Sequence, residues 1–408
     1  MTTRPGFMII GASLAGAKAA QAMRKEGYDG RITLIGDERH RPYERPPLSK
    51  DYLLGKAERD SVFVHAEQWY AEHEVDLRLG TKVAALDLSR HEIAMSTGER
   101  LAYDKLLITT GSAPRRLSIP GAGLAGVHYL RRLEDSDGIK VAFDQAERVA
   151  IVGAGWIGLE TAAAARAVGL EVTLLESAEL PLMRILGPQV AQLFADLHRD
   201  QGVHLRCGVQ LTEFIGTAGA VSGVRLVGGQ VIDADVVLVG VGVTPVTDLA
   251  EDAGLDVRNG IVLNQHLRTS HPDIYAAGDV ANAYHPLLGR PIRVEHWANA
   301  RRQAAVAARS MLGQDASYDR LPYFYSDQYD LSMEYTGYIE PDADHDVVLR
   351  GDPGKGGYIA FWLEHGRVLA GMNVNTWDAA GPIEELIRSA RSVDTDRLAD
   401  PDVPWEQL

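Results

Sequence analysis

Short apolar runs alternate with glycine turns and alanine-rich segments at the start of the chain. FMII (7–10) predicts a buried strand, and the hexamer GASLAG (11–16) follows it as a turn. AGAKAAQAMRKEG (15–27) has helical spacing and ends at a glycine that suits a helix C-terminus. RITLIGDE (31–38) predicts a second strand that two acidic residues close. Strand, glycine turn, helix and strand with an acid at its end form the dinucleotide-binding βαβ unit.

The same order occurs a second time. RVAIV (148–152) predicts a strand, GAGWIG (153–158) the turn, GLETAAAARAVG (158–169) a helix and LEVTLLE (170–176) a strand that ends in an acid. From first glycine to acid there are about 26 residues in the first copy and about 23 in the second, near the ~20 of the motif. After each copy comes a polar hairpin and a buried strand, so the repeat is a duplicated domain.

The later chain predicts the remaining organisation. The stretch 269–282 reads as a strand ending in Gly-Asp, a helix follows at 298–312, and both are expected to complete the first domain, with the second inserted between. From about Pro322, aromatic-rich antiparallel strands and a helix near 382–391 predict a small α+β domain. The predicted fold is α/β: two Rossmann-like dinucleotide-binding domains in a glutathione reductase-like arrangement, plus this C-terminal domain. The predicted boundaries are 1–113 and 242–319 for the first domain, 114–241 for the second and 320–408 for the third.

Composition narrows the class of partner. A formal net charge of −15 over 408 residues disfavours nucleic acid, whose phosphates need a basic surface. We expect no membrane span because no apolar run approaches ~20 residues. The N-terminus lacks the pattern of a signal peptide, which favours a cytoplasmic enzyme. A single cysteine, Cys207, excludes an internal disulfide and a Cys-x-x-Cys pair, and we expect no structural metal because no His/Cys cluster has ligand spacing.

Two nucleotide loops in one chain suggest two nucleotides that exchange a hydride, a flavin and a nicotinamide. GASLAG carries Ser13 where the motif has its middle glycine. Serine is small, so this loop can still approach a phosphate, and its hydroxyl can bond a phosphate oxygen.

Seven segments together resemble the FAD-dependent NADH:ferredoxin reductases of bacterial haem-thiolate monooxygenases and aromatic-ring dioxygenases. They are GASLAG, LIGDERHRPYERPPLSKDYL, TTGSAPR, YLRRLED, GAGWIGLE, IYAAGDVAN and PYFYSDQYD. The resemblance implies that the serine-containing loop holds FAD permanently and that GAGWIG binds NADH in passing. It also implies a [2Fe-2S] ferredoxin as the electron acceptor.

The resemblance assigns FAD contacts position by position. It places Ala15 at the pyrophosphate, Asp37 at the adenosine ribose, Val83 at the adenine side, Asp279 near the ribityl chain and Trp297 by the isoalloxazine. The full predicted set is Gly11, Ser13, Leu14, Ala15, Gly16, Asp37, Glu38, Arg45, Lys50, Val83, Thr110, Gly111, Arg131, Gly278, Asp279 and Trp297. Five of them also have an ordinary interpretation: a turn for Asp37, a helix cap for Asp279, core packing for Trp297, and solvated charges for Lys50 and Arg131.

Glu176 is the residue that distinguishes NADH from NADPH as the expected cofactor. A carboxylate at that strand end accepts hydrogen bonds from ribose hydroxyls and repels a 2′-phosphate, so we expect NADH rather than NADPH. By resemblance, Glu160 reaches the nicotinamide and pairs with Lys50 beside the flavin, and both are the predicted catalytic residues. The alternative for Glu160 is a first-turn acid that the helix dipole favours. The predicted NADH set is Gly153, Gly155, Trp156, Ile157, Gly158, Glu160, Glu176 and Gly242.

Docking of an acidic ferredoxin to an acidic chain requires a local basic patch. Arg301, Arg302 and Arg309 on the 298–312 helix are candidates, with a solvated helix face as the alternative. Two rival functions stay open: an NADH oxidase or disulfide reductase, which needs a cysteine near the flavin, and a redox protein like apoptosis-inducing factor, which needs a basic surface.

Overall fold

The computed structural model describes residues 5–408 and separates into two compact units. Unit 1 takes in the chain up to Glu44, Arg59–Ala113 and Val243–Pro322. Unit 2 takes in Arg45–Glu58, Pro114–Gly242 and Tyr323–Leu408. Three borders between the units, after residues 113, 242 and 322, lie within a few residues of the predicted domain boundaries. Residues 45–58 lie within the predicted first domain but belong to unit 2.

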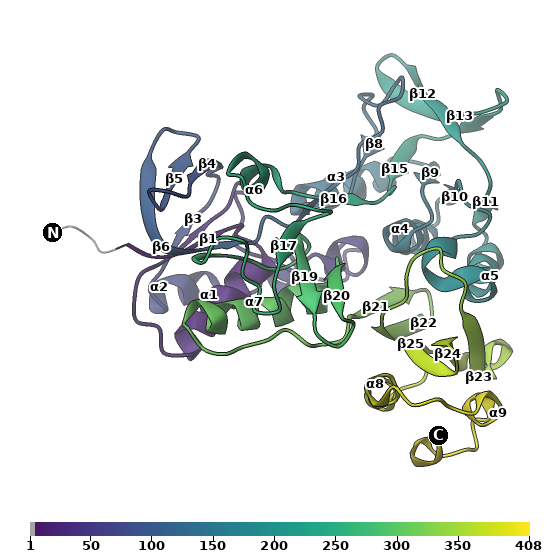
Figure 1. The fold of residues 1–408 in the computed structure, drawn as a ribbon. Helices are drawn as coiled ribbons and strands as arrows, with labels where there is room; N and C mark the ends of the chain where they lie inside the picture. The colour runs from purple at the N-terminus through teal and green to yellow at the C-terminus, as the bar shows by residue number, and fades with distance from the viewer. Residues whose placement is uncertain (1–4) are drawn as a thin grey trace. The chain divides into compact units, whose positions relative to one another are not determined.

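Unit 1 is built on a five-stranded parallel sheet of order β3-β2-β1-β6-β18. The amino-terminal half of β6 also pairs with the antiparallel strand β5, which in turn pairs with β4. Helices α1 and α7 pack against each other on this sheet (Figure 1). The bounds are β1 Gly6–Ile10, α1 Leu14–Lys25, β2 Ile32–Ile35, η2 Arg59–Val62, α2 Glu67–Glu72, β3 Val75–Arg78, β4 Val83–Asp87, β5 Glu92–Met95, β6 Arg100–Ile108, β7 Ser112–Pro114, β16 Val243–Pro245, α6 Asp248–Asp252, β17 Ile261–Leu263, β18 Ile274–Ala276, β19 Ala281–His285, β20 Arg290–Arg293 and α7 Trp297–Met311.

Unit 2 contains a second parallel sheet, of order β11-β10-β9-β15-β8, with the antiparallel strands β12, β13 and β14 as a separate sheet. The bounds are η1 Pro46–Ser49, β8 Val127–His128, α3 Leu133–Asp144, β9 Arg148–Val152, α4 Trp156–Ala167, β10 Glu171–Leu175, α5 Met183–Asp200, β11 His204–Arg206, β12 Leu211–Thr217, β13 Ala220–Leu226, β14 Val231–Asp233 and β15 Val236–Val239.

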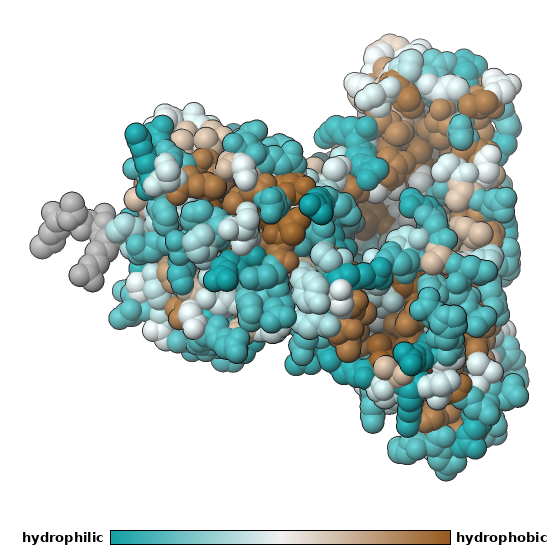
Figure 2. Space-filling model, viewed as in Figure 1, coloured by the Kyte–Doolittle hydropathy of each residue, from teal (hydrophilic) through white to brown (hydrophobic). Residues whose placement is uncertain are grey.

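The carboxyl-terminal part of unit 2 is a five-stranded antiparallel sheet, β21-β22-β25-β24-β23. Its bounds are β21 Tyr323–Gln328, β22 Leu331–Gly337, β23 Asp346–Asp352, η3 Pro353–Lys355, β24 Gly357–Glu364, β25 Arg367–Val374, α8 Ala380–Ser389, α9 Thr395–Ala399 and η4 Trp405–Gln407. The visible surface over α8 and α9 is mostly hydrophilic (Figure 2).

One hydrophobic core joins the two parts of unit 2. Leu159 and Phe194 from the helices pack in the same cluster as Tyr335 and Trp362 from the antiparallel sheet. The indole N–H of Trp362 donates to the carbonyl of Leu186 at 3.0 Å. The antiparallel sheet is therefore a fixed neighbour of α4 and α5, and its first strand, β21, contributes side chains to the site described next.

The order of strands shows the duplication directly. In each parallel sheet the strand before the glycine loop lies between the strand after the helix and a later buried strand. The fifth strand differs in origin, because β18 comes from far downstream in unit 1 whereas β8 precedes the βαβ unit in unit 2. The predicted fold class, two Rossmann-like domains with a small α+β domain, is confirmed.

Candidate functional site

The first glycine loop leaves β1 and opens α1 in unit 1. Gly11 has φ +117°, and a Cβ there would collide with the carbonyl oxygen of Thr109. A Cβ on Gly16 would collide with the carbonyl of Gly11, so these two glycines are imposed by the backbone itself.

The amino-terminus of α1 is open to an anion. No described side chain caps the helix at Ser13, and its first turn holds no acidic residue. Backbone N–H groups at such an end, with the positive end of the helix dipole, suit a pyrophosphate. The loop therefore fits the phosphate part of FAD.

Other predicted FAD residues of unit 1 gather around this loop. A Cβ on Gly278 would lie 3.4 Å from the Cβ of Ala15, and Trp297 packs against the cluster of Leu14, Ala15 and Ala300. The hydroxyl of Ser112, the first residue of β7, donates to Asp279 Oδ2 at 2.7 Å. The hydroxyl of Thr110 donates to the carbonyl of Val246 at 2.7 Å, and Gly111 accepts from the Val246 N–H at 2.9 Å.

The residues predicted to contact the adenosine part of FAD lie after β2 and at the start of β4. Gly36 directly follows β2, so Asp37 and Glu38 lie two and three residues beyond the strand end. Glu38 accepts a hydrogen bond from the hydroxyl of Tyr43. The side chain of Val83 is buried in the core of unit 1, so an adenine contact there would go through its backbone. These assignments stay predictions.

The second glycine loop repeats the geometry in unit 2. Gly153 has φ +97°, and a Cβ on Gly158 would collide with the carbonyl of Gly153. Gly155 precedes α4 with φ −78°, and a Cβ there would meet no described atom within 4 Å. No described side chain caps α4.

Glu176 follows β10 and turns back to this loop. Its Oε2 accepts from the N–H of Ala154 at 2.6 Å, and its Oε1 from the N–H of Ala178 at 2.9 Å. Arg206, on the neighbouring strand, pairs with Leu175 and donates to Gln230 at 2.6 Å. Sequence reasoning did not find this arginine because it lies about 30 residues downstream and becomes a neighbour only through the sheet.

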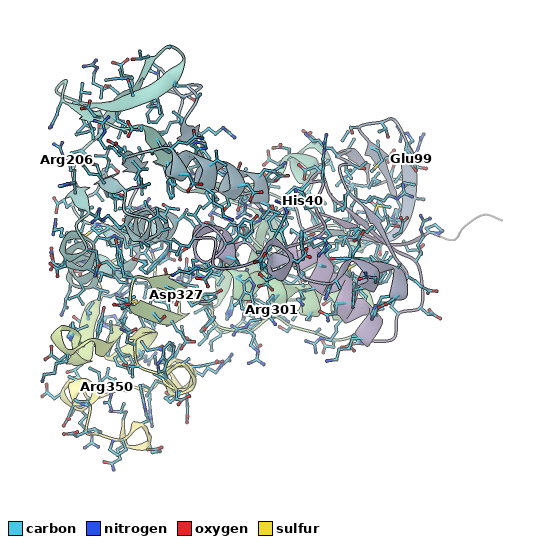
Figure 3. All side chains as sticks on the ribbon, turned by 180° about the vertical axis from the view of Figure 1, so that it is seen from behind. His40, Glu99, Arg206, Arg301, Asp327 and Arg350 are labelled. Atoms are coloured by element: carbon cyan, nitrogen blue, oxygen red, sulfur yellow. The ribbon has the colours of Figure 1, made fainter. Side chains whose placement is uncertain are left out.

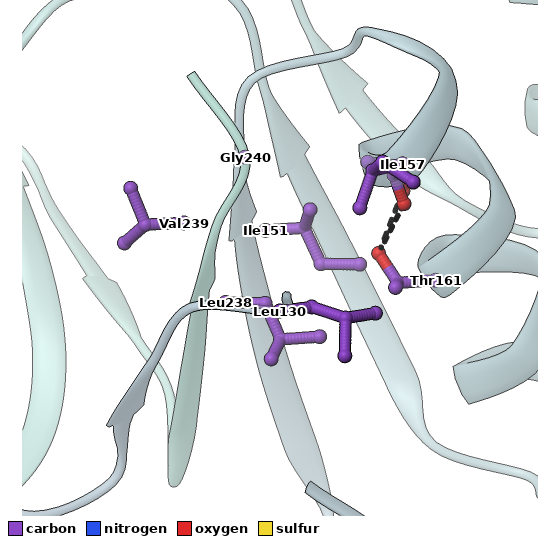
Figure 4. Close-up of a pocket in the computed structure, with 8 residues that line it drawn as sticks. Leu130, Ile151, Ile157, Thr161, Leu238, Val239 and Gly240 are labelled. Atoms are coloured by element: carbon purple, nitrogen blue, oxygen red, sulfur yellow. Dashed lines mark hydrogen bonds between the residues drawn. The ribbon is translucent and has the colours of Figure 1, made fainter. Parts of the chain in front are cut away.

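A small apolar pocket lies beside α4 (Figure 4). Ile151, Leu238 and Ile157 line it, and the Thr161 hydroxyl turns away from it to bond the carbonyl of Ile157 at 2.8 Å. Trp156, in contrast, is directed into the core, with its ring 5.5 Å from Phe194 and 5.1 Å from Phe324. Gly242 accepts a backbone hydrogen bond from Arg115 at 2.9 Å.

Lys50 and Glu160 form a largely buried ion pair in unit 2. Lys50 Nζ lies 3.2 Å from Glu160 Oε1, with side-chain exposures of 13% and 6%. Because α4 begins at Trp156, Glu160 lies in the second helical turn, and the interpretation as a first-turn acid is wrong. The pairing expected from the resemblance is confirmed.

Sequence reasoning missed several further residues of this cluster. The Ser49 hydroxyl donates to Glu160 Oε2 at 2.5 Å, Lys50 Nζ lies 3.6 Å from Asp327 Oδ2, and it lies 4.4 Å from the ring centre of Tyr325. Figure 3 labels Asp327 on β21. Ser49 directly precedes Lys50 in the RPPLSK segment. The only sequence signal for Tyr325 and Asp327 was the PYFYSDQYD segment, whose alternation puts these two side chains on one face of a strand.

The arginines at the other predicted positions also lie in unit 2. The Arg45 guanidinium donates to the carbonyl of Arg131, which ties the segment before η1 to the turn before α3. The structure thus brings Arg45 and Arg131 together. Arg45 precedes η1, which ends directly before Lys50, and Arg131 precedes α3, which packs on η1.

The described residues include one half-buried cysteine and no cluster of metal-ligating side chains. Between residues 5 and 408, no three His, Cys, Asp or Glu side chains gather as metal ligands would. Burial raises the pKa of the half-buried Cys207, which disfavours a reactive thiolate. Over the same residues, no helix is long and apolar enough to cross a membrane.

Comparison with known proteins fits this geometry. Residues 6–304 match the pyridine nucleotide-disulphide oxidoreductase family, and residues 323–408 match the reductase C-terminal family. The ferredoxin reductase subunit of the 5,5′-dehydrodivanillate O-demethylase of a Sphingobium strain is 38% identical, over 98% of this chain and 97% of that protein. The ferredoxin–NAD(+) reductase component of the anthranilate 1,2-dioxygenase system of Burkholderia cepacia is 39% identical, over 97% of each chain.

A solved structure agrees as well. The reductase in the covalent putidaredoxin reductase–putidaredoxin complex superposes with a TM-score of 0.94 and 35% identity, over 99% of this chain and 98% of that chain. The chain belongs to the pyridine nucleotide-disulphide oxidoreductase family, among the ferredoxin reductases of oxygenase systems.

Proposed function

We propose that this protein is the FAD-containing reductase component of an oxygenase system, which oxidises NADH and passes the electrons to a [2Fe-2S] ferredoxin. The observation that carries the proposal is a chain with two open glycine loops whose full-length relatives at 38–39% identity are ferredoxin reductases. We further propose that it works in the cytoplasm.

The residues around the first loop fit FAD, and those around the second fit NADH. When bound, FAD accepts two electrons as a hydride and releases them one at a time. The backbone N–H groups at the start of α1 would hold the pyrophosphate, and Asp279, fixed by Ser112, would hold the ribityl chain. Arg45, Lys50 and Arg131 are the cations proposed to extend along the cofactor.

Glu176 selects the nicotinamide nucleotide. Two backbone N–H groups hold its carboxylate at the loop, so ribose hydroxyls can donate to a charge that is already oriented. A 2′-phosphate would meet this negative charge. NADH is therefore the proposed substrate.

Lys50 and Glu160 are the proposed catalytic pair. Charges held in a largely buried setting act more strongly than in water and need no reorganisation during the reaction. We propose that Glu160 orients the nicotinamide carboxamide and that Lys50 supplies a fixed positive charge beside the flavin.

The ferredoxin would dock on α7. Arg301 and Arg302 are exposed, and the Arg301 guanidinium lies 4.3 Å from the ring centre of Trp297, one of the proposed flavin contacts (Figure 3). Arg302 donates to the carbonyl of Leu321 at 3.2 Å, and Arg309 lies two turns further on.

Charge reversal tests this docking surface. The double variant R301E/R302E should raise the KM for ferredoxin about tenfold and leave NADH-driven ferricyanide reduction unchanged, because ferricyanide needs no docking. R90E/R100E, which makes the same charge change on other exposed arginines of unit 1, is the matched control. Equal ferredoxin kinetics in both double variants would remove α7 from the docking surface.

The disulfide reductase alternative finds no support in the cluster. The cluster around Lys50 and Glu160 consists of Lys, Glu, Ser, Asp and Tyr side chains, with no cysteine. Cys207 instead follows β11, on the parallel sheet that carries the second glycine loop. Purification, a visible spectrum and NADH-driven reduction of a panel of [2Fe-2S] ferredoxins test the proposed function. A protein that binds FAD and reduces none of these ferredoxins, but reduces oxygen or disulfides, would contradict it.

A further inference from the structure

Strand β21 lies against α4 with matching spacing. Phe324 and Ser326 are two apart on one face of the strand, and Trp156 and Glu160 are four apart on one face of the helix. The rings of Phe324 and Trp156 lie 5.1 Å apart, and the Ser326 hydroxyl lies 2.7 Å from Glu160 Oε1. The register of the strand on the helix therefore brings Ser326 to the carboxylate of the ion pair.

Buried polar contacts continue from Ser326 to α5. Gln328 Nε2 lies 3.1 Å from Ser326 Oγ, and Gln328 Oε1 lies 2.9 Å from His198 Nε2. His198 Nδ1 lies 3.1 Å from the Tyr329 hydroxyl. His198 is 0% exposed, and Ser326 and Gln328 are each 1% exposed, so water cannot replace these bonds.

The charge on Glu160 fixes the direction of every bond in this chain. A carboxylate paired with Lys50 can only accept, so Ser326 must donate to it and accept from the Gln328 amide N–H. The Gln328 carbonyl then faces His198, whose Nε2 must carry the proton. Its Nδ1 accepts from the Tyr329 hydroxyl.

The state of His198 agrees with this direction. Burial lowers the pKa of His198 to about 4, so the imidazole is neutral near pH 7 and has one donor and one acceptor nitrogen. Nε2 donates to Gln328 and Nδ1 accepts from Tyr329, so both ring nitrogens are used. At no bond in the chain do two donors face each other.

We infer that Tyr329, His198, Gln328 and Ser326 form a one-way hydrogen-bond chain that positions the Glu160 carboxylate and, through it, Lys50. Ser326 and Gln328 are thus positioning residues for hydride transfer, a role that rests on the proposed function. The inference gives the aromatic-rich carboxyl-terminal segment a part in the reaction, because β21 supplies both residues.

The test measures the reactivity of the Lys50 amino group. Competitive acetylation of the FAD-loaded protein, read by mass spectrometry, compares Lys50 with Lys355, whose side chain is 85% exposed. In S326A, Glu160 loses a charge-assisted bond and holds Lys50 less firmly, so relative acetylation of Lys50 should rise about five- to tenfold. Q328E keeps the shape but cannot donate to Ser326, and should change labelling in the same direction.

S310A is the matched control. It removes the hydroxyl of another buried serine, on α7, and should leave Lys50 labelling unchanged. If S326A retains too little FAD or folds poorly, Q328E carries the same comparison. Lys50 labelling in S326A and Q328E equal to that of the wild type would overturn the inference, whatever the enzyme turns out to reduce.

A kinetic split tests the positioning role. At saturating NADH, the rate constant for flavin reduction should fall about tenfold in S326A, while the dissociation constant for NADH changes less than about threefold. Increased labelling with an unchanged rate constant would overturn the positioning role. A wild-type protein that NADH cannot reduce would refute the proposed function and leave the labelling result standing.

Discussion

The loop Gly11–Gly16 in unit 1 and the loop Gly153–Gly158 in unit 2 both turn at a first glycine of positive φ, +117° and +97°. In both, a side chain on the third glycine would collide with the carbonyl of the first. Both lead into a helix that no described side chain caps. The protein's own backbone requires these features, whichever nucleotide binds.

The middle position behaves differently. Ser13 has φ −125° and Gly155 has φ −78°, values open to any residue, and a Cβ at Gly155 would enter open space. The middle glycine is therefore not needed by the fold, and any requirement for it comes from the ligand. This explains physically why the first loop tolerates a serine.

The strand ends also differ. The N–H groups of Gly11 and Gly153 bond the carbonyls of Ile35 and Leu175, so Gly36 is the structural equivalent of Glu176. A Cβ on Gly36 would crowd Ala12, the counterpart of Ala154. Unit 1 accordingly has its acid one residue later, at Asp37, while unit 2 bonds its acid to the loop. Two loops of the same geometry can thus bind different nucleotides, because the acidic residue after the neighbouring strand is placed differently in each.

The largest effect is expected at Gly11. G11A forces an alanine into φ +117° and against the Thr109 carbonyl, and should destabilise unit 1 by more than about 3 kcal/mol and abolish FAD retention. G27A is the control, because Gly27 also has positive φ but open space, and should lose about 1 kcal/mol. Equal melting temperatures and FAD contents in the two variants would contradict the account.

Acid should weaken unit 2 through His198. Its folded pKa of about 4 lies below the ordinary 6.5, so the unfolded chain binds more protons and stability falls as the pH falls from 6.5 to 4. At pH 5 the loss should reach about 2 kcal/mol. Thermal unfolding of the wild type and H198Q at pH 7 and pH 5 measures it, and an equal decrease in both proteins would exclude His198 as the cause.

A smaller effect is expected at the strand end of unit 2. E176Q should raise the KM for NADH about tenfold and leave the KM for NADPH unchanged or lower, because a charged acceptor for the ribose is lost. E171Q, at the exposed start of the same strand, is the control. Steady-state ferricyanide reduction with each nucleotide gives both constants, and a parallel rise for NADPH would argue against selection by charge.

The smallest effect is expected from making the loops alike. G155S gives the second loop the serine of the first, in open space, and should change stability by less than about 0.5 kcal/mol. The KM for NADH should rise no more than about threefold if serine suits a phosphate loop. Loss of folding in this variant would show that the middle position is constrained by the protein after all.

The parts of the fold that are local in sequence could be predicted. Both βαβ units were readable because the glycines, the alanine-rich helices and the apolar strands follow one another within about 30 residues. The Lys50–Glu160 pair came from a family resemblance, since its members lie far apart in the chain. The placement of 45–58 in unit 2 could not be read, because nothing in its composition marks a change of unit.

The partners of Glu160 were beyond sequence reasoning for a related reason. Ser326 and Gln328 are unremarkable polar residues in an aromatic strand, and their role appears only when β21 lies on α4 and α5. Asp327 reaches Lys50 from the same strand. The register between a strand and two helices is set by packing and leaves no signal in spacing.

The most direct test of the central claim is an anaerobic titration of the purified protein with NADH, followed by its flavin absorbance. The account predicts a yellow protein with one FAD per chain that one equivalent of NADH reduces fully, and that an added [2Fe-2S] ferredoxin reoxidises. A protein that retains no FAD, or whose bound FAD stays oxidised with excess NADH, would contradict it.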